Sequence, residues 1–260
     1  MKGSTISEVP DWKIRPPLAK WILGYPDQAR QLGRAALEFC RTSGLRTRML
    51  SELFAGQLSQ LMREAGEAAQ RAAAAERLAI EYGSLQGAGV AMVTHGWAIA
   101  ESGDPARGIA QIGRARETLD ASGSRLHNHL DVVRAQCLLQ LGQIEEGLEV
   151  VAAALVYMEA SEERVFAAEI NRLKGELLAR DGALGEEAEA AFRAAIAIAQ
   201  HQRAKSWELR ATTSLARLLA KQGKRGDARA MLSEIYNWFT EGFDTADLKD
   251  AKALLDELNG

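Results

Sequence analysis

A small residue recurs about every forty residues along most of the chain. It occupies Ala29, Ala69, Gly108, Gly147, Ala188 and Ala228, and the step from each to the next is nearly constant. A fixed period of this length is typical of proteins built from stacked copies of one supersecondary unit. One such unit cannot bury its apolar face alone, so each copy has to pack against its neighbours.

A second column of small residues indicates what the unit is. It comprises Gly96, Ala135, Gly175 and Ala216, which are spaced by the same period. Two antiparallel helices joined by a short turn approach closely only where their side chains are small. Only five prolines occur, three of them close to the N-terminus, and an Ala-rich chain with so little proline favours helix. We therefore predict an all-α fold, an α-solenoid of stacked antiparallel helical hairpins; a compact bundle would not need the repeat.

The period also sets the expected boundaries. Hairpins are expected at about 46–82, 85–122, 125–161, 164–202 and 204–241, after a partial unit at 18–43. The chain then divides into a loose tail at 1–17, a helical repeat domain at 18–245 with about five and a half hairpins, and a capping helix at 246–260. Glycines are expected in the turns (Gly24, Gly103, Gly142, Gly182, Gly223) and at the ends of second helices (Gly44, Gly83, Gly123).

The charge balance argues against a nucleic-acid partner. The chain has 32 Lys and Arg against 35 Asp and Glu, a formal net charge of -3, whereas a general nucleic-acid binder is more basic. The longest apolar run, Val150 to Met158, is about half as long as a membrane crossing requires. The N-terminus has no apolar signal segment, and two distant cysteines fit a reducing compartment. We expect a cytoplasmic protein that contacts neither membrane nor nucleic acid.

Signatures of catalysis and of metal or cofactor binding are missing from the sequence. The glycine spacing of Gly142 and Gly147 resembles a phosphate loop, but the loop contains Glu145 and Glu146 and lacks the following Lys-Ser/Thr. His127 and His129 are two residues apart, which places them on different sides of a helix rather than around one metal ion. We therefore predict no enzymatic activity, no cofactor and no metal site.

Two family resemblances follow from particular stretches. Gly175 with Ala188, and Ala216 with Ala228, resemble the small positions of the tetratricopeptide repeat (TPR), here lengthened beyond its usual period. Residues 23–29, 96–98, 169–178 and 236–245 resemble the C-terminal repeat region of bacterial adenylate/guanylate cyclase–P-loop ATPase signalling regulators. This second resemblance implies a role in bacterial signalling. The chain itself carries neither a cyclase nor an ATPase domain, so the resemblance transfers no activity.

In TPR proteins the first helices line the concave surface, where partners bind. The residues that the repeat register places there are Trp97, His129, Gln136, Glu169, Arg172, Glu176, Arg210 and Arg217. They predict a groove that is apolar near Trp97 and charged near Glu169. The alternative is structural, because Glu169, Arg172 and Glu176 have the spacing of helix-stabilising ion pairs and Trp97 can pack between hairpins.

The sequence leaves several functions open. The first is a non-catalytic scaffold that binds a protein or peptide in the concave groove. The second is the detached regulatory arm of a cyclase or P-loop ATPase regulator, with that ATPase or cyclase as its partner. The third is a small-molecule sensor. Apolar residues near the N-terminus (Trp12, Ile14, Trp21, Ile22) also suggest either a makeshift cap or a dimer contact at that end.

Overall fold

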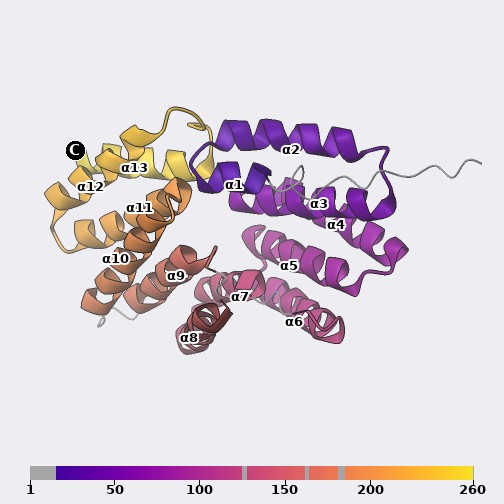
Figure 1. Ribbon diagram of the computed structural model, residues 1–260. Coiled ribbons are helices and arrows are strands. Elements are labelled where there is room, and N and C mark those ends of the chain that lie inside the picture. Colours follow the sequence, from indigo (N-terminus) through magenta and orange to yellow (C-terminus); the bar gives the residue numbers. More distant parts are fainter. Residues whose placement is uncertain (1–15, 125–127, 162–163, 181–184, 260) are drawn as a thin grey trace, which may run out of the picture. The chain divides into compact units, whose positions relative to one another are not determined.

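The computed structural model describes residues 16–124, 128–161, 164–180 and 185–259. Every regular element within these ranges is an α-helix (Figure 1), which confirms the predicted all-α class. The helices are α1 (Pro16–Ile22), α2 (Pro26–Cys40), α3 (Leu45–Leu61), α4 (Ala65–Tyr82), α5 (Leu85–Glu101), α6 (Pro105–Ala121), α7 (Asn128–Leu141), α8 (Ile144–Ser161), α9 (Ala167–Arg180), α10 (Gly185–His201), α11 (Lys205–Lys221), α12 (Arg225–Trp238) and α13 (Ala246–Asn259).

The chain forms two compact units. Among the described residues, the first contains 16–21 and 27–124, and the second contains 22–26 and those from 128 onward. In the first unit the hairpin α3–α4 stacks on the hairpin α5–α6 through α4 and α5. In the second unit the hairpins α7–α8, α9–α10 and α11–α12 stack in order, and α13 packs against α11 and α12. Stacked antiparallel hairpins are the architecture that the repeat predicts.

The small-residue columns lie where paired helices approach most closely. A Cβ atom on Gly108 would be 2.8 Å from the carbonyl oxygen of Gly96, so the α5 and α6 backbones nearly touch. In the second unit, a Cβ atom on Gly175 of α9 would be 2.5 Å from the ring of Phe192 on α10. Ala216 and Ala228, the corresponding pair of α11 and α12, are both fully buried. Each of these hairpins therefore closes on small residues.

Turn chemistry explains where the helices begin and end. Gly103, Gly142 and Gly223 have positive φ angles, a conformation that glycine adopts without steric cost. Asp104 caps α6 by accepting a hydrogen bond of 3.0 Å from the Arg107 amide, which satisfies one of the free donors at a helix start.

Two turns differ from the glycine pattern. In the turn between α3 and α4, which has none of the expected turn glycines, Arg63 has a φ of 63°. Gly44 was expected at the end of a second helix, but its φ is -62° and it precedes α3 as the N-cap residue. Gly182 lies outside the described residues.

The segment between α1 and α2 belongs to the second unit. Tyr25 lies 5.7 Å from Trp238, measured between ring centroids, and a Cβ atom on Gly24 would be 2.6 Å from the Trp238 ring. Lys205 also lies over Trp238, at 5.4 Å from the ring centroid. This non-local packing has no counterpart in the repeat pattern.

The residues expected at a dimer contact are only partly described. Trp21 is 2% exposed, so its ring is already covered within the chain. Trp12 and Ile14 lie outside the described residues.

None of the described helices combines the length and apolar character that crossing a membrane requires. Over the same residues, His, Cys, Asp and Glu side chains do not gather in threes as metal ligands do. Cys40 and Cys137 are both buried free thiols.

Candidate functional site

Seven of the eight predicted groove residues lie in the second unit. His129 and Gln136 are on α7, Glu169, Arg172 and Glu176 are on α9, and Arg210 and Arg217 are on α11. These are first helices of successive hairpins, and α9 contacts both α7 and α11. Trp97 is on α5 in the first unit, where it is only 3% exposed.

Glu169 and Arg172 form a buried ion pair on α9. Arg172 donates from Nη2 to Glu169 Oε1 at 2.8 Å and from Nε to Glu169 Oε2 at 2.9 Å. The Glu169 side chain is 1% exposed and that of Arg172 is 16% exposed. This two-point contact is the geometry in which a guanidinium binds a carboxylate most strongly.

The pKa values of both groups follow from this pairing. Burial alone would raise the pKa of Glu169, but the charge and hydrogen bonds of Arg172, the charge of Arg210 and a hydrogen bond from Gln136 lower it overall. Burial would likewise lower the pKa of Arg172, but the charge and hydrogen bonds of Glu169 and the charge of Glu176 raise it. Both side chains are therefore fixed in their charged forms.

The pair is also tied to the neighbouring first helices. Gln136 on α7 donates from Nε2 to Glu169 Oε1 at 3.3 Å. On the other side, Arg172 Nη1 donates to Glu176 Oε1 at 3.1 Å, and the hydroxyl of Ser214 on α11 donates to the same oxygen at 2.6 Å. A single polar network thus spans α7, α9 and α11.

A second ion pair joins α11 to the terminal helix. Arg210 Nε lies 2.8 Å from Asp247 Oδ2, and both side chains are 12% exposed. The Arg210 guanidinium also lies 5.1 Å from the ring centroid of Trp207. Arg217, by contrast, lies 4.0 Å from Asp250, and the two side chains are 48% and 41% exposed. An exposed pair at that distance contributes little stability, so Arg217 keeps its freedom to bind another group.

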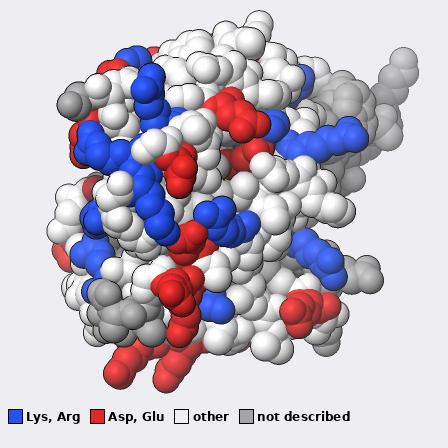
Figure 2. Space-filling model, turned by 90° about the vertical axis from the view of Figure 1, so that its left-hand side faces the viewer, with Lys and Arg blue, Asp and Glu red and all other residues white. Residues whose placement is uncertain are grey.

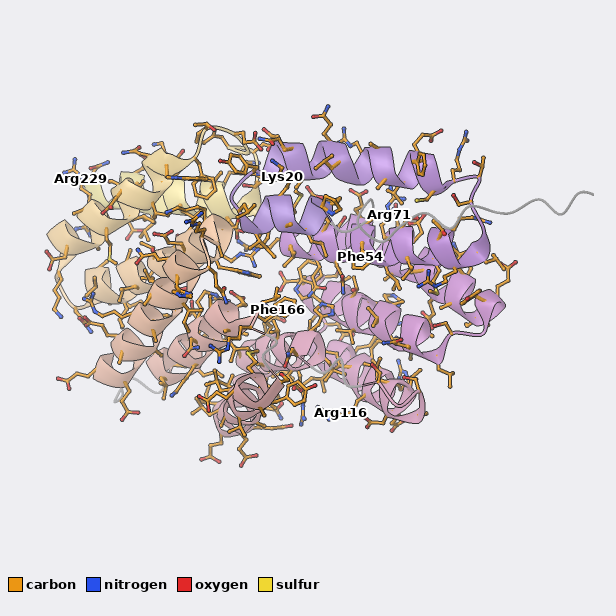
Figure 3. All side chains as sticks on the ribbon, in the orientation of Figure 1. Lys20, Phe54, Arg71, Arg116, Phe166 and Arg229 are labelled. Carbon is orange, nitrogen blue, oxygen red and sulfur yellow. The ribbon has the colours of Figure 1, made fainter. Side chains whose placement is uncertain are left out.

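Aromatic rings lie at the starts of the same first helices. Phe166, labelled in Figure 3, immediately precedes α9. Its ring stacks on His129 at 5.8 Å and meets Trp207 at 6.3 Å between centroids. We call His129, Phe166 and Trp207 the aromatic row. Burial lowers the pKa of His129 to about 4, so the imidazole is neutral at physiological pH.

Sequence reasoning missed Phe166, Trp207, Ser214 and Asp247. A signal for two of them exists, since Phe166 and Trp207 are separated by one repeat period, the same step that separates Glu169 from Arg210. Ser214 and Asp247 carry no such signal. Asp247 lies on the helix that follows the last repeat, so the period does not extend to it.

Charge is mixed rather than segregated on the face drawn in Figure 2, where Lys and Arg side chains lie near Asp and Glu side chains. At the turn between α11 and α12, Lys224 Nζ is 3.6 Å from Glu189, and Arg225 donates to the carbonyl oxygen of Glu257.

Comparison with known proteins supports the fold. Neither a protein-family model nor a curated protein sequence matches the chain. Among solved structures, the apo form of RapI is similar with a TM-score of 0.53 and 12% identity, over 96% of this chain and 97% of that one. A Rap protein complexed with competence and sporulation factor is similar with a TM-score of 0.63 and 15% identity, over 95% and 79%. These likenesses agree with a TPR-like helical repeat. They give no support to the resemblance to cyclase–ATPase regulators.

Proposed function

We propose that the chain is a non-catalytic, TPR-like binding module, and that the first helices of its second unit hold an extended segment of a partner protein or peptide. The observation that carries the proposal is the polar network across α7, α9 and α11. Its carboxylates at Glu169 and Glu176 are both held by Arg172. Fixed charges of this kind suit binding contacts rather than proton transfer.

The proposed contacts are three residues, each of which directly follows a member of the second column of small residues. Gln136, Glu176 and Arg217 stand on successive first helices, and each keeps part of its side chain exposed. An amide, a carboxylate and a guanidinium together offer donors and acceptors for the N–H and C=O groups of an extended peptide. The buried Glu169–Arg172 pair beside them holds the row in place, and such preorganisation reduces the entropic cost of binding.

The aromatic row supplies the apolar part of this surface. Phe166 and His129 are partly exposed, and Trp207 behind them is 2% exposed. The stacked rings of His129 and Phe166 present a rigid apolar surface of low conformational entropy, the type of anchor that peptides and proteins bind with one large side chain. We propose that the partner places an apolar residue here and polar backbone along the row of Gln136, Glu176 and Arg217.

The similarity to Rap proteins supports a peptide or protein as the partner. A Rap protein with the same fold has been solved in complex with competence and sporulation factor. We propose by analogy that this chain acts in bacterial signalling as a protein-interaction scaffold. The analogy rests on fold alone, so the site residues have to be tested directly.

A peptide library tests the proposal. The immobilised full chain is panned against displayed random peptides, and the affinity of a recovered peptide is measured by calorimetry against variants. Arg217→Ala and Gln136→Ala are expected to weaken binding about tenfold each. Lys174→Ala is the matched control, because Lys174 is exposed two residues from Glu176 on α9 and therefore faces another side of the helix.

The result that would overturn the proposal is equally definite. Recovered peptides that bind all three variants as tightly as the wild type would place the binding surface elsewhere. A library that yields no peptide above background would count against an extended segment as the partner.

A further inference from the structure

The first unit contains a basic hollow that has no part in the proposed function. It lies among α2, α3 and α4, has a volume of about 360 Å³, and we call it the α2–α4 hollow. This volume lies at the lower end of the range for small-molecule sites, about 300–1,000 Å³.

Arginines dominate the lining. Arg34, Arg41, Arg48 and Arg71 face two carboxylates, Glu38 and Glu52, which leaves a formal excess of two positive charges. The arginines come from three places in the sequence: α2 and the residue after it, α3, and α4. The packing of α2, α3 and α4 therefore brings the four arginines to one hollow. They do not form a single run of charge along one helix.

Two of the four guanidiniums have no partner. Within the part of the chain that the structure describes, the Arg34 and Arg48 side chains make no hydrogen bond, ion pair or ring contact. Arg41 pairs with Glu38 at 3.2 Å, but these side chains are 73% and 71% exposed, so the pair is weak and exchanges readily. Arg71, which is labelled in Figure 3, has two partners, Glu52 at 3.3 Å and Glu67 at 3.2 Å.

The remaining walls suit an organic group. Leu37 and Leu78 supply apolar surface, while the buried Cys40 and Ser51 close the hollow between α2 and α3. Ser51 donates its hydroxyl hydrogen to the Arg48 carbonyl oxygen at 2.8 Å, which fixes the backbone that presents the Arg48 side chain. The hollow thus combines a basic opening with an apolar side.

We propose that the α2–α4 hollow binds a phosphoryl group carried on an organic molecule. A phosphate monoester has a charge of about -1.5 to -2 at neutral pH, which the two guanidiniums of Arg34 and Arg48 would balance. Its oxygens accept paired hydrogen bonds from guanidinium groups. Arg34 and Arg48 are the principal ligands, Arg41 joins them by releasing Glu38, and Leu37 and Leu78 contact the organic part.

Calorimetry with the full chain tests this proposal. The probes are inorganic phosphate, O-phosphoserine and a short phosphoserine peptide, each with its unphosphorylated counterpart where one exists. We expect the phosphorylated probes to bind and the unphosphorylated ones not to. The double variant Arg34→Gln/Arg48→Gln is expected to lower the affinity at least about tenfold. Both residues are exposed, so the variant should fold, and circular dichroism checks this.

Arg46→Gln is the matched control, because Arg46 lies one residue into α3 but does not line the hollow. Its affinity for the probes should equal that of the wild type. Tighter binding of the phosphopeptide than of free O-phosphoserine identifies a phosphorylated protein as the source of the group, and the reverse order identifies a small phosphate ester. Absence of binding at millimolar probe overturns the proposal, as does an equal loss of affinity in the Arg46→Gln variant.

Discussion

At the scale of single residues, the buried carboxylate of Glu169 depends on one guanidinium. Arg172 makes two hydrogen bonds to it, and the Glu169 side chain is 1% exposed. Replacing Arg172 by Met would leave a buried charge uncompensated. We expect the free energy of unfolding to fall by about 3–5 kcal/mol, measured by urea denaturation.

An exposed ion pair on the second unit provides the comparison. Arg193 pairs with Glu189 at 2.7 Å, and the Arg193 side chain is 58% exposed, so Arg193→Met should cost less than about 1 kcal/mol. Adding Glu169→Gln to Arg172→Met should restore part of the lost stability. Equal costs for the two arginine variants would show that Glu169 is not held as described. For the same reason, Arg172 variants test stability rather than partner binding.

His129 should make stability depend on pH. Burial lowers its pKa to about 4 in the folded chain, from 6.5, so the unfolded chain binds a proton that the folded chain rejects between these values. Stability is therefore full above about pH 6.5 and falls as the pH drops toward 4, by up to about 3 kcal/mol. Urea denaturation from pH 4.5 to 7.5 measures this loss.

The His129→Gln variant is the reference for that measurement, because it removes the titrating ring and should flatten the profile across the same range. Glu169 affects stability at lower pH than His129 does. Its pKa is below the ordinary 4.5, so the stability it contributes is present above that value and is lost as the pH falls further. An unchanged slope in His129→Gln would assign the dependence to another group.

The repeat register predicts which helix carries each candidate residue, but it does not predict how deeply the side chain is buried. His129, Glu169 and Arg210 recur with the repeat period, and all three lie on first helices of the second unit. Their exposure depends on the neighbouring helix, which periodicity does not describe. Glu169 is 1% exposed while Arg217 is 48% exposed, although both were expected to line one open groove.

At the scale of elements, the two helices of a hairpin meet at small residues, and the surrounding atoms leave no space for a larger side chain. A Cβ atom on Gly108 of α6 would be 2.8 Å from the Gly96 carbonyl oxygen and 3.3 Å from the Ala100 amide nitrogen. Both are backbone atoms, which cannot move aside without separating α5 from α6. We expect Gly108→Ala to destabilise the chain by about 1–3 kcal/mol, measured as a shift in the urea midpoint.

The same helix contains its own control. Gly113 is exposed, and a Cβ atom there would meet nothing within 4 Å. Gly113→Ala should therefore stabilise the chain by about 0.5–1 kcal/mol, since glycine is the poorer helix former. Opposite signs for the two substitutions are the expected result. A stabilising effect at Gly108 would mean that α5 and α6 are further apart than described.

This closeness is the part of the fold that the sequence predicts best. Columns of small residues mark the places where two helices pack most tightly, and Gly96, Gly108 and Gly175 all lie at such places. The turns were predicted less completely. Arg63 and Arg203 adopt positive φ angles. Arginine does not favour this conformation, and the residue pattern does not predict it.

At the scale of the whole molecule, the repeat period predicts the hairpins within each unit. It does not predict which other segments of the chain pack against that unit. Residues 22–26 belong to the second unit, where Tyr25 meets Trp238, more than two hundred residues along the chain. Periodicity reports contacts between successive repeats, so a contact between the beginning and the end of the repeat region leaves no signal in it. The same holds for Arg34, Arg48 and Arg71, which only the packing of α2, α3 and α4 brings to one hollow.

Gly24 tests how much the second unit depends on that distant segment. Its φ is +93°, and a Cβ atom there would be 2.6 Å from the Trp238 ring and 2.7 Å from Lys205 Cβ. Gly24→Ala therefore adds a steric clash to a backbone strain of about 1–2 kcal/mol. Gly223→Ala is the control, because Gly223 has a φ of +82° but nothing within 4 Å of the added atom.

Comparing the two variants separates the clash from the strain. Gly24→Ala should lose about 1–3 kcal/mol more than Gly223→Ala, and backbone amides in 236–245 should exchange hydrogen faster only in Gly24→Ala. That segment contains Trp238, the side chain that the new methyl group would displace, so faster exchange there reports the loss of the 22–26 contact. If both variants lose the same stability and leave exchange at 236–245 unchanged, the second unit is complete without residues 22–26.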